Sequence, residues 1–219
     1  MPDQPRESRG SHAGNRFDRR RARTRSALIS AARALLAEGA AAEASIQEIA
    51  DRADVGFGSF YNHFESKSAL FDTAVMDALD EYGQLIDAVA GGVEDPAEVF
   101  SASVRMTIRM METHPELAQV LRRRGIEQLH ADAGLAPRAL RDIEKGVATG
   151  RFSVEDPRIA LSAVGGSILG LLQLESVRPD ISGPDAAEQL AALILRMLGL
   201  PPGEAREVAR RPLPLEPRG

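Results

Sequence analysis

The chain has 219 residues, of which 43% are apolar, and its formal net charge is −5 at pH 7. This length and apolar content allow a sizeable core in one or two domains. Because the sequence contains no cysteine, disulfide bonds and thiol chemistry are excluded.

Positive charge is concentrated at the start of the chain. Residues 1–25 contain eight arginines against three acidic residues, a local balance of +5, so the remaining residues carry −10. We expect residues 1–18 to be a flexible basic arm that reaches along a duplex, the alternative being a solvated tail without contacts. A first helix is predicted from about Arg19 to Glu38, and Arg23 and Arg25 near its start are well placed to contact phosphate.

Residues 45–55 predict a short helix followed by a tight turn. Ser45 and Glu48 form a capping box, in which each side chain accepts a hydrogen bond from a backbone N–H at the helix start. The helix is expected to end near Ala53, because Asp54 tolerates the left-handed conformation that a tight turn needs. Val55 can then fill the corner between this helix and the next.

A third helix is predicted from Phe57 to about His63, with Gly56 as its N-cap. Phe60 and Phe64, four residues apart, are expected to point inward. The outward side chains are aromatic or small and hydrogen-bonding, which suits the groove edges and phosphates of DNA; they are Phe57, Ser59, Tyr61, Asn62 and His63.

A fourth helix is predicted, with Ser66 as its cap and Lys67 in its first turn. A cation in that position opposes the helix dipole. We therefore expect Lys67 to have another partner, such as a phosphate.

The run VGFGSFYNHFESKSALF, together with the helix start at Ser45 and the preceding helix, resembles the DNA-binding domain of the TetR family of transcriptional regulators. The resemblance covers residues 19–72 and implies a helix-turn-helix domain there. Many members have a basic or small polar residue where this chain has Phe57, so we expect an apolar contact at that position, with a thymine methyl or a sugar. Carried over by position, the resemblance implies phosphate contacts from Ser45, Ser59, Tyr61 and Lys67, and base or groove contacts from Gly56, Phe57, Asn62 and His63.

Beyond residue 72 the sequence predicts helices almost throughout, with prolines in their first turns. The expected helices cover about 96–113, 115–124, 135–150, 157–178 and 184–198, and no strand-like alternation occurs, so the predicted fold is all-α. Residues 73–199 are expected to form a larger helical domain, which the resemblance implies is for effector binding and dimerisation. Residues 200–219 contain five prolines and are expected to be a disordered tail.

The helix at 96–113 is apolar on more than one side, which places it at the centre of its bundle. In the TetR family the corresponding domain holds an effector cavity, and methionines are adaptable lining for irregular apolar ligands. The alternative for each such side chain is ordinary core packing. Arg105 and Arg109 are expected on a solvated, ion-paired face; if either faces the cavity, the ligand has to carry an anionic group. The candidate ligand-binding residues are Phe100, Val104, Met106, Ile108, Arg109, Met110, Met111 and Phe152.

The last two predicted long helices carry stripes suited to close packing. Small residues allow two backbones to approach, so two such helices from each protomer can form an intersubunit four-helix bundle. This arrangement resembles the dimer interface of the TetR family and predicts a twofold homodimer, the alternative being packing within one chain. The candidate interface residues are Ala163, Gly166, Ser167 and Gly170 on one helix and Leu190, Ala191, Ile194 and Leu198 on the other.

The most apolar run, residues 159–174, is shorter than the roughly 20 residues that a bilayer requires. We expect it to be a buried helix of a cytoplasmic protein that has no membrane partner. The four histidines are far apart, and the sequence contains no phosphate loop, nucleophile elbow or dinucleotide fingerprint. We therefore expect no metal, no cofactor and no enzymatic activity.

These features predict a ligand-responsive transcriptional regulator. The most specific form of the prediction is a homodimeric repressor that a small, largely apolar effector releases from an inverted-repeat operator in double-stranded DNA. One alternative is an all-helical small-molecule binding protein or enzyme without a DNA role. Another is a DNA-coating protein with little sequence specificity.

Overall fold

The computed structural model describes residues 11–129 and 131–213. Those residues form ten α-helices and no strand, which confirms the predicted all-α fold. The chain divides into two compact units, residues 1–74 and 75–219. Helix α4 (Lys67–Ala90) begins in the first unit and continues into the second.

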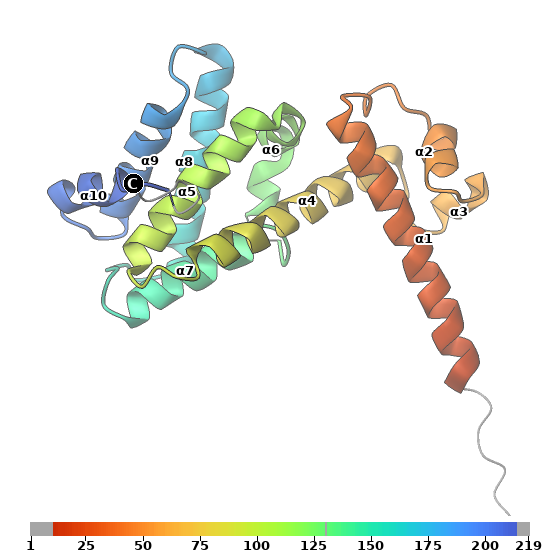
Figure 1. Cartoon of the computed structure of the whole chain (residues 1–219), viewed down its shortest axis with the longest axis horizontal. Helices are drawn as coiled ribbons and strands as arrows, with labels where there is room; N and C mark the ends of the chain where they lie inside the picture. Colours follow the sequence, from red (N-terminus) through yellow and green to blue (C-terminus); the bar gives the residue numbers. More distant parts are fainter. Residues whose placement is uncertain (1–10, 130, 214–219) are drawn as a thin grey trace, which may run out of the picture. The chain divides into compact units, whose positions relative to one another are not determined.

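The N-terminal unit contains α1 (Ser11–Ala37), α2 (Ile46–Arg52), α3 (Phe57–Tyr61) and the first turns of α4. Helix α1 lies against α2, as Figure 1 shows. It begins at Ser11, so residues 11–18, which we expected in a flexible arm, are helical; residues 1–10 lie outside the described part of the chain. The core is formed by fully buried side chains from all four helices: Leu28, Leu35, Ile49, Phe60 and Leu70.

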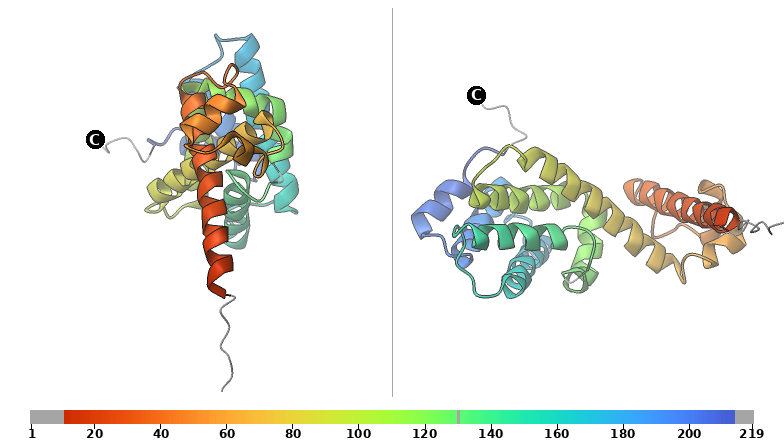
Figure 2. Two further views of the ribbon diagram at one scale, coloured as in Figure 1. Left: turned by 90° about the vertical axis from the view of Figure 1, so that its right-hand side faces the viewer. Right: turned by 90° about the horizontal axis from the view of Figure 1, so that it is seen from below.

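The C-terminal unit is a helical bundle built around α5 (Pro96–Thr113). Ten of the 18 residues of α5 are buried, which makes it the central helix, as its two-sided apolar pattern predicted. The surrounding helices are α6 (Pro115–Gln128), α7 (Ala136–Ala148), α8 (Pro157–Val177) and α9 (Pro184–Met197). Figure 2 shows α5 running beside α7.

Proline and aspartate together fix two of these helix starts. Pro96 and Pro157 occupy first-turn positions, where the N–H that proline lacks has no helical partner. The carboxylate of Asp95 accepts a hydrogen bond from the N–H of Ala97 at 2.9 Å, and that of Asp156 accepts one from the N–H of Arg158 at 2.7 Å. Each aspartate therefore satisfies a backbone donor that the helix leaves open.

The prediction of a disordered tail after residue 200 is wrong for most of that segment. Helix α10 (Pro202–Ala209) packs against α9, with Ala205, Val208 and Ala209 buried, and Leu213 beyond it is buried as well. Pro202 begins this helix instead of preventing one, because proline is favourable in a first turn. Residues 214–219 lie outside the described part of the chain.

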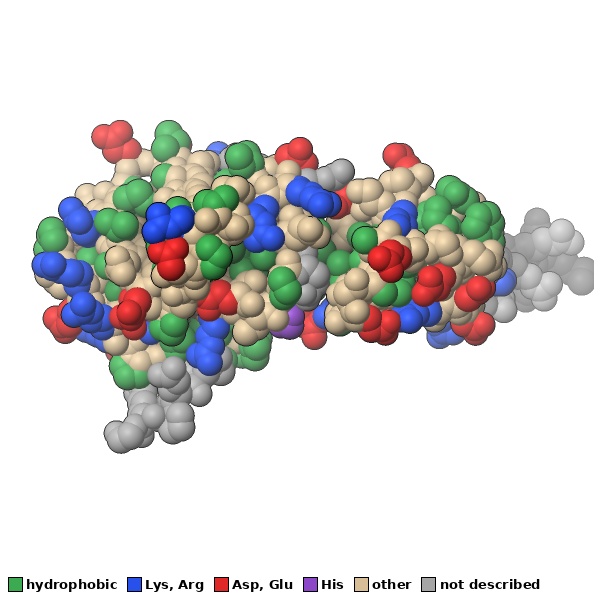
Figure 3. All heavy atoms as spheres, turned by 90° about the horizontal axis from the view of Figure 1, so that it is seen from above, with side chains coloured by type: hydrophobic (Ala, Val, Ile, Leu, Met, Phe, Trp, Pro, Cys, Tyr) green, Lys and Arg blue, Asp and Glu red, His purple; other side chains and the backbone are tan. Residues whose placement is uncertain are grey.

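Ion pairs and a hydrogen bond attach α10 and the residues after it to the rest of the bundle. Arg151 donates to Asp95 at 2.8 Å and to Glu204 of α10 at 2.6 Å. Arg105 of α5 donates to the backbone oxygen of Arg211 at 2.6 Å. Over the C-terminal unit, positive and negative side chains lie next to each other on the face shown in Figure 3.

Helix α8 is more exposed than we expected. Among the described residues it is the one helix long and apolar enough to cross a membrane by length and composition, and 22% of its most apolar window is buried. Leu161, Val164 and Leu172 face the core. Ile159 and Val177 are 70% and 64% exposed. The expectation of a helix buried within the chain is therefore wrong for one face of α8, which is apolar and uncovered.

Candidate DNA-binding surface and ligand cavity

The turn between α2 and α3 has the predicted construction. The Ser45 hydroxyl accepts a hydrogen bond from the N–H of Glu48 at 3.1 Å, which confirms the serine half of the capping box. Helix α2 ends at Ala53, and Asp54 has a φ of 53°, the left-handed conformation that the turn requires. Val55 is half-buried at the corner.

Helix α3 is shorter than predicted but presents the expected side chains. It ends at Tyr61, with Asn62 as its C-cap, while Gly56 is its extended N-cap. Phe60 is fully buried, as predicted, whereas Phe57 and Tyr61 are 47% and 55% exposed. The rings of Phe57 and Tyr61 meet edge to face with centroids 5.9 Å apart. Two exposed rings held together in this way form an apolar platform beside the polar groups of Ser59 and Asn62.

Lys67 has partners that the sequence did not reveal. Its ammonium donates to the backbone oxygens of Ala42 at 2.8 Å and Ala44 at 3.0 Å. It therefore anchors the loop before α2 to the start of α4. Because an ammonium has three N–H donors, one remains for a phosphate, and the predicted contact of Lys67 with DNA stays a prediction.

The arginines of α1 lie on different faces. Arg21 and Arg25 line a cleft together with His63, while Arg23, also exposed, does not. The guanidinium of Arg25 lies 5.0 Å from the ring centre of Phe64. Arg21 was not among the predicted contacts, although its spacing of four residues from Arg25 places both on one helix face. Burial, followed by the charges of Arg21 and Arg25, lowers the pKa of His63 below its usual value.

The C-terminal unit contains a cavity of about 120 Å³ between α4, α5, α6, α7 and α8. Three of the predicted ligand-binding residues line it: Phe100, Val104 and Met111. The other five do not, because they lie on other sides of α5 or beyond it: Met106, Ile108, Met110 and Phe152 are buried in the packed core and Arg109 is exposed. The remaining apolar lining includes leucines from α4, α6 and α8 and from the loop between α6 and α7.

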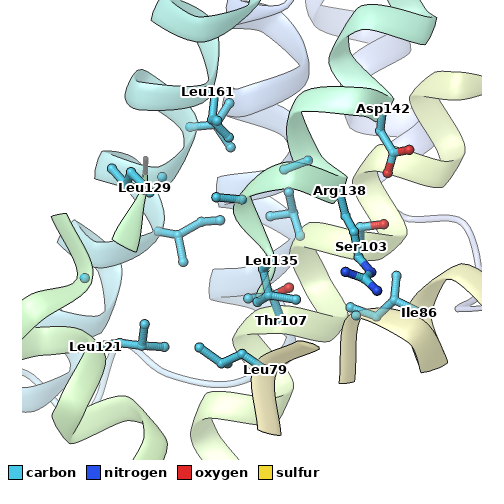
Figure 4. A pocket seen from close by; sticks show the side chains of 18 of the residues that line it. Leu79, Ile86, Ser103, Thr107, Leu121, Leu129, Leu135, Arg138, Asp142 and Leu161 are labelled. Atoms are coloured by element: carbon cyan, nitrogen blue, oxygen red, sulfur yellow. The ribbon is translucent and has the colours of Figure 1, made fainter. Parts of the chain in front are cut away.

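Three of the polar side chains that line the cavity lie on one side of it. Figure 4 shows Ser103, Arg138 and Asp142 together at one side, and Leu121, Leu129 and Leu161 at the opposite side. Thr107 and Asp87 complete the polar lining.

Arg138 of α7 connects the cavity to α4. Its guanidinium donates to Asp80 at 2.8 Å and to Asp87 at 3.1 Å, two turns apart on α4, and it is 22% exposed. Gly83 lies between these two aspartates, and a Cβ atom there would be 2.7 Å from Cδ of Arg138. The glycine therefore allows the arginine to cross α4 closely.

Asp142 is the most buried charged group of the lining, with 13% of its side chain exposed. Burial raises its pKa above the usual value, even though Arg141 donates to it at 2.8 Å. The same Arg141 bonds Asp87 at 2.7 Å and lowers the pKa of that carboxyl. The charged form is therefore stabilised for the Asp87 carboxyl group and disfavoured by burial for that of Asp142.

Neither arginine that we considered on α5 lines the cavity. Arg105 bonds the backbone of Arg211 and lies 3.5 Å from Glu188, and Arg109 is exposed. The guanidinium that lines the cavity is that of Arg138. Its position could not be predicted, because nothing in the sequence shows that α7 packs beside α4 at the cavity.

Close approaches between glycines and leucines shape the apolar side. A Cβ atom on Gly165 would lie 2.0 Å from Cδ2 of Leu129, and one on Gly125 would lie 2.4 Å from Cδ2 of Leu169. Both leucines line the cavity, so their positions depend on the absence of a side chain on the facing helix.

The predicted dimer residues divide into two groups. On α8, Ala163, Gly166 and Gly170 are exposed and Ser167 is half-buried. On α9, Leu190 is half-buried, whereas the stripe of Ala191, Ile194 and Leu198 is fully buried within the chain. These three residues cannot form an interface, because α5 and α10 pack on that side of α9. The apolar side chains that α9 exposes are Leu193 and Met197.

Within residues 11–129 and 131–213, no group of three or more histidine, cysteine, aspartate or glutamate side chains could hold a metal ion.

Comparison with known proteins identifies the family. Residues 28–74 match the family of bacterial regulatory proteins called tetR, and residues 95–211 match the tetracyclin repressor-like C-terminal domain. The crystal structure of RolR with its ligand resorcinol is 34% identical, covers 89% of this chain and 97% of that chain, and has a TM-score of 0.72. RolR without ligand has a TM-score of 0.70 at 34% identity, over 85% of this chain and 96% of that chain.

A third relative matches over a shorter stretch. The transcriptional repressor KstR2 of Rhodococcus jostii (strain RHA1) is 34% identical over 74 residues, which are 33% of this chain and 36% of that repressor. The match therefore spans about a third of the length of that relative. Together with the helix-turn-helix geometry and the cavity, these matches show that the chain is a ligand-responsive transcriptional regulator that belongs to the TetR family.

Proposed function

We propose that the protein is a homodimeric repressor that a small phenolic compound releases from its operator. The observation that carries the proposal is the two-sided cavity, which lies in a chain 34% identical to a regulator crystallised with resorcinol over nearly its whole length. As a DNA-binding regulator, the protein acts in the cytoplasm, where its operator is accessible.

The size of the cavity supports a ligand with one aromatic ring. A cavity of about 150 Å³ lined by apolar side chains is known to accept benzene in another protein. The cavity of about 120 Å³ is of the same order. Its leucine side, with Leu121, Leu129 and Leu161, can cover the faces of a ring while the polar side meets its substituents.

The charges on the polar side favour hydroxyl groups over a carboxylate. Arg138 is already bonded to Asp80 and Asp87, so it can donate to a phenolic oxygen but does not require an anion. Asp142 can accept a hydrogen bond from a phenolic O–H. A ligand carboxylate would instead lie beside Asp87 and Asp142, and like charges in a site with little water repel strongly. A dihydroxybenzene offers the donors and acceptors that these groups need.

Helix α4 supports a route from the ligand to DNA. It runs without a break from Lys67, in the DNA-binding unit, to Asp80 and Asp87, which hold the cavity arginine. A phenol that bonds Arg138 competes with those aspartates and so changes the preferred position of α4. We propose that this shifts the population toward a state whose DNA-binding units no longer fit successive half-sites, which are about 34 Å apart.

The exposed apolar face of α8 and α9 supports a homodimer. Ile159 and Val177 on α8 and Leu193 and Met197 on α9 are each at least 46% exposed. The exposed small residues of α8, Ala163, Gly166 and Gly170, would let a second copy approach closely. Among the predicted interface residues, we retain these three with Ser167 and Leu190.

At the DNA, we propose contacts from the positions that the family resemblance implies. Ser45, Ser59, Tyr61 and Lys67 would contact phosphates, and Arg23 and Arg25 of α1 would add further phosphate contacts. Gly56, Phe57, Asn62 and His63 would contact bases or groove walls. The exposed Phe57–Tyr61 ring pair fits an apolar contact with a thymine methyl.

The test is a binding titration of the full chain on the DNA that flanks its own gene. We expect the protein to prefer one inverted repeat over random duplex, and resorcinol to weaken that binding, while benzoate does not. Tyr61→Ala should lower affinity for the repeat. A protein without sequence preference, or one whose DNA binding ignores dihydroxybenzenes, contradicts the proposal.

Dimerisation has its own test. Leu193→Arg places a charge on the proposed interface, and Leu85→Arg is a matched control because Leu85 is 47% exposed on α4 and Leu193 is 52% exposed. We expect sedimentation to show monomers for the first variant and dimers for the second. Two dimeric variants would exclude this face as the interface.

A further inference from the structure

The N-terminal unit contains a cleft of about 290 Å³ beside α3. Its lining comes from α1 and from the residue after the C-cap of α3: Asp18, Arg21, Ala22, Arg25 and His63. Two guanidinium groups and an imidazole therefore share one small space with a single carboxylate.

The two arginines are available to a ligand. Within the described residues, neither guanidinium has a carboxylate within ion-pair distance, although Asp18 lines the same cleft. Arg25 rests on the ring of Phe64, which restricts its side chain and lowers the entropy lost when it binds an anion. Arg21 is exposed one turn before it on the same face of α1.

Positive charge outweighs negative charge in the cleft, and the pKa of His63 is consistent with this imbalance. Burial and the nearby Arg21 and Arg25 hold its pKa below the usual value, so the neutral imidazole is favoured when the cleft is empty. An anion that entered would reduce the repulsion among the three groups.

The position of the cleft identifies the anion. His63 follows Asn62 directly and lies two residues after Tyr61, which is 55% exposed. A strand of DNA contacted by Tyr61 or Asn62 therefore passes within reach of His63. The anion such a strand presents is the phosphodiester, which guanidinium groups bind in a bidentate manner.

We propose that Arg21, Arg25 and His63 together bind one phosphate of the DNA backbone, outside the helix that reads the bases. The inference rests on the DNA-binding function of the family. It adds Arg21 to the proposed phosphate contacts, beside Arg25, and assigns His63 to a phosphate instead of to a base or groove wall. Because a phosphate carries no sequence information, this cleft contributes affinity equally on operator and random DNA. It also contributes to the salt dependence of binding, since each phosphate contact releases counterions.

The test compares Arg21→Ala with Arg20→Ala, which removes the same charge from an exposed neighbour outside the cleft. Both full-length variants are titrated with a random duplex and with the flanking DNA over a range of salt. For Arg21→Ala we expect about tenfold weaker binding on both duplexes and a log–log salt slope reduced by about 0.9 for each DNA-binding unit engaged. Arg20→Ala should retain most of the affinity and slope.

Equal losses of DNA affinity in Arg21→Ala and Arg20→Ala would overturn the inference. The proposed regulator function would not be affected, because it is tested separately by the binding of the wild-type chain to its operator. A second measurement follows His63 by NMR titration in the wild-type chain. The charged groups that line the cleft with it are Asp18, Arg21 and Arg25. Bound phosphate should raise the pKa of His63 relative to free protein; an unchanged or lower pKa in the complex refutes a phosphate in this cleft.

Discussion

Replacing Arg138 with methionine tests whether the cavity arginine recognises the effector. The substitution removes donors to Asp80 and Asp87 and to the backbone oxygen of Gly134. Neither carboxylate is left alone, because Gln84 still donates to Asp80 at 3.0 Å and Arg141 to Asp87 at 2.7 Å. The cost to folding is therefore modest.

The magnitudes follow from these contacts. Both ion pairs of Arg138 are partly exposed, so their loss should lower the free energy of unfolding by about 1–2 kcal/mol. In a chain of this length that corresponds to a melting temperature lower by about 2–8 °C. A charge-assisted hydrogen bond to a phenolic oxygen contributes about 1.5–3 kcal/mol, so resorcinol should bind roughly 10- to 100-fold more weakly.

Arg151→Met is the control for this substitution. Arg151 also donates to two carboxylates and is 25% exposed, against 22% for Arg138, but it does not line the cavity. Calorimetric titration with resorcinol and thermal melts of both variants separate the two effects. We expect similar melting temperatures and a loss of ligand affinity only in Arg138→Met. Equal ligand affinity in the two variants would refute direct recognition by Arg138.

Three further predictions concern the same unit. Gly83→Ala should favour the helix by about 1 kcal/mol but displace Arg138, so we expect nearly unchanged thermal stability together with weaker resorcinol binding; unchanged binding would contradict the close contact. Asp142→Asn should become increasingly more stable than the wild type in urea unfolding as pH rises through the folded-state pKa of Asp142, because a raised carboxyl pKa destabilises the native state once the group ionises; a stability difference that does not vary with pH refutes this. Ending the chain after Gly199 removes the buried contacts of α10, so we expect a loss of more than about 3 kcal/mol by chemical denaturation, and a loss under about 1 kcal/mol would show that α10 is dispensable.

The local structural features of the DNA-binding unit could be predicted from the sequence. The capping serine Ser45, the left-handed Asp54 and the buried Phe60 depend on residues a few positions apart, so the sequence contains all the information that fixes them. The hydrogen bonds of Lys67 could not be predicted in this way, because the backbone oxygens that accept them lie 23 and 25 residues earlier in the chain. The sequence identified the helix that holds Lys67 but not its partners.

The cavity could be predicted only in part, because five helices form it. Phe100, Val104 and Met111 were recognisable from the two-sided apolar pattern of α5. Arg138 and Asp142 lie on α7, and their relation to the cavity depends on how α7 packs beside α5. The prediction of a disordered tail after residue 200 rests on its proline content and is wrong for α10. This helix has only 8 residues, which are too few for an apolar pattern to indicate a helix by itself.

The glycine–leucine contacts on the apolar side of the cavity affect how such a regulator could change its inducer during evolution. A methyl group added at Gly165 would displace the side chain of Leu129, and one at Gly125 would displace that of Leu169; both leucines line the cavity. Each change is a single codon step that alters the shape available to the aromatic ring while Arg138 and Asp142 keep their hydrogen bonds. Inducer size and inducer chemistry can therefore be selected separately, and a biosensor library should randomise the two glycines before the charged residues.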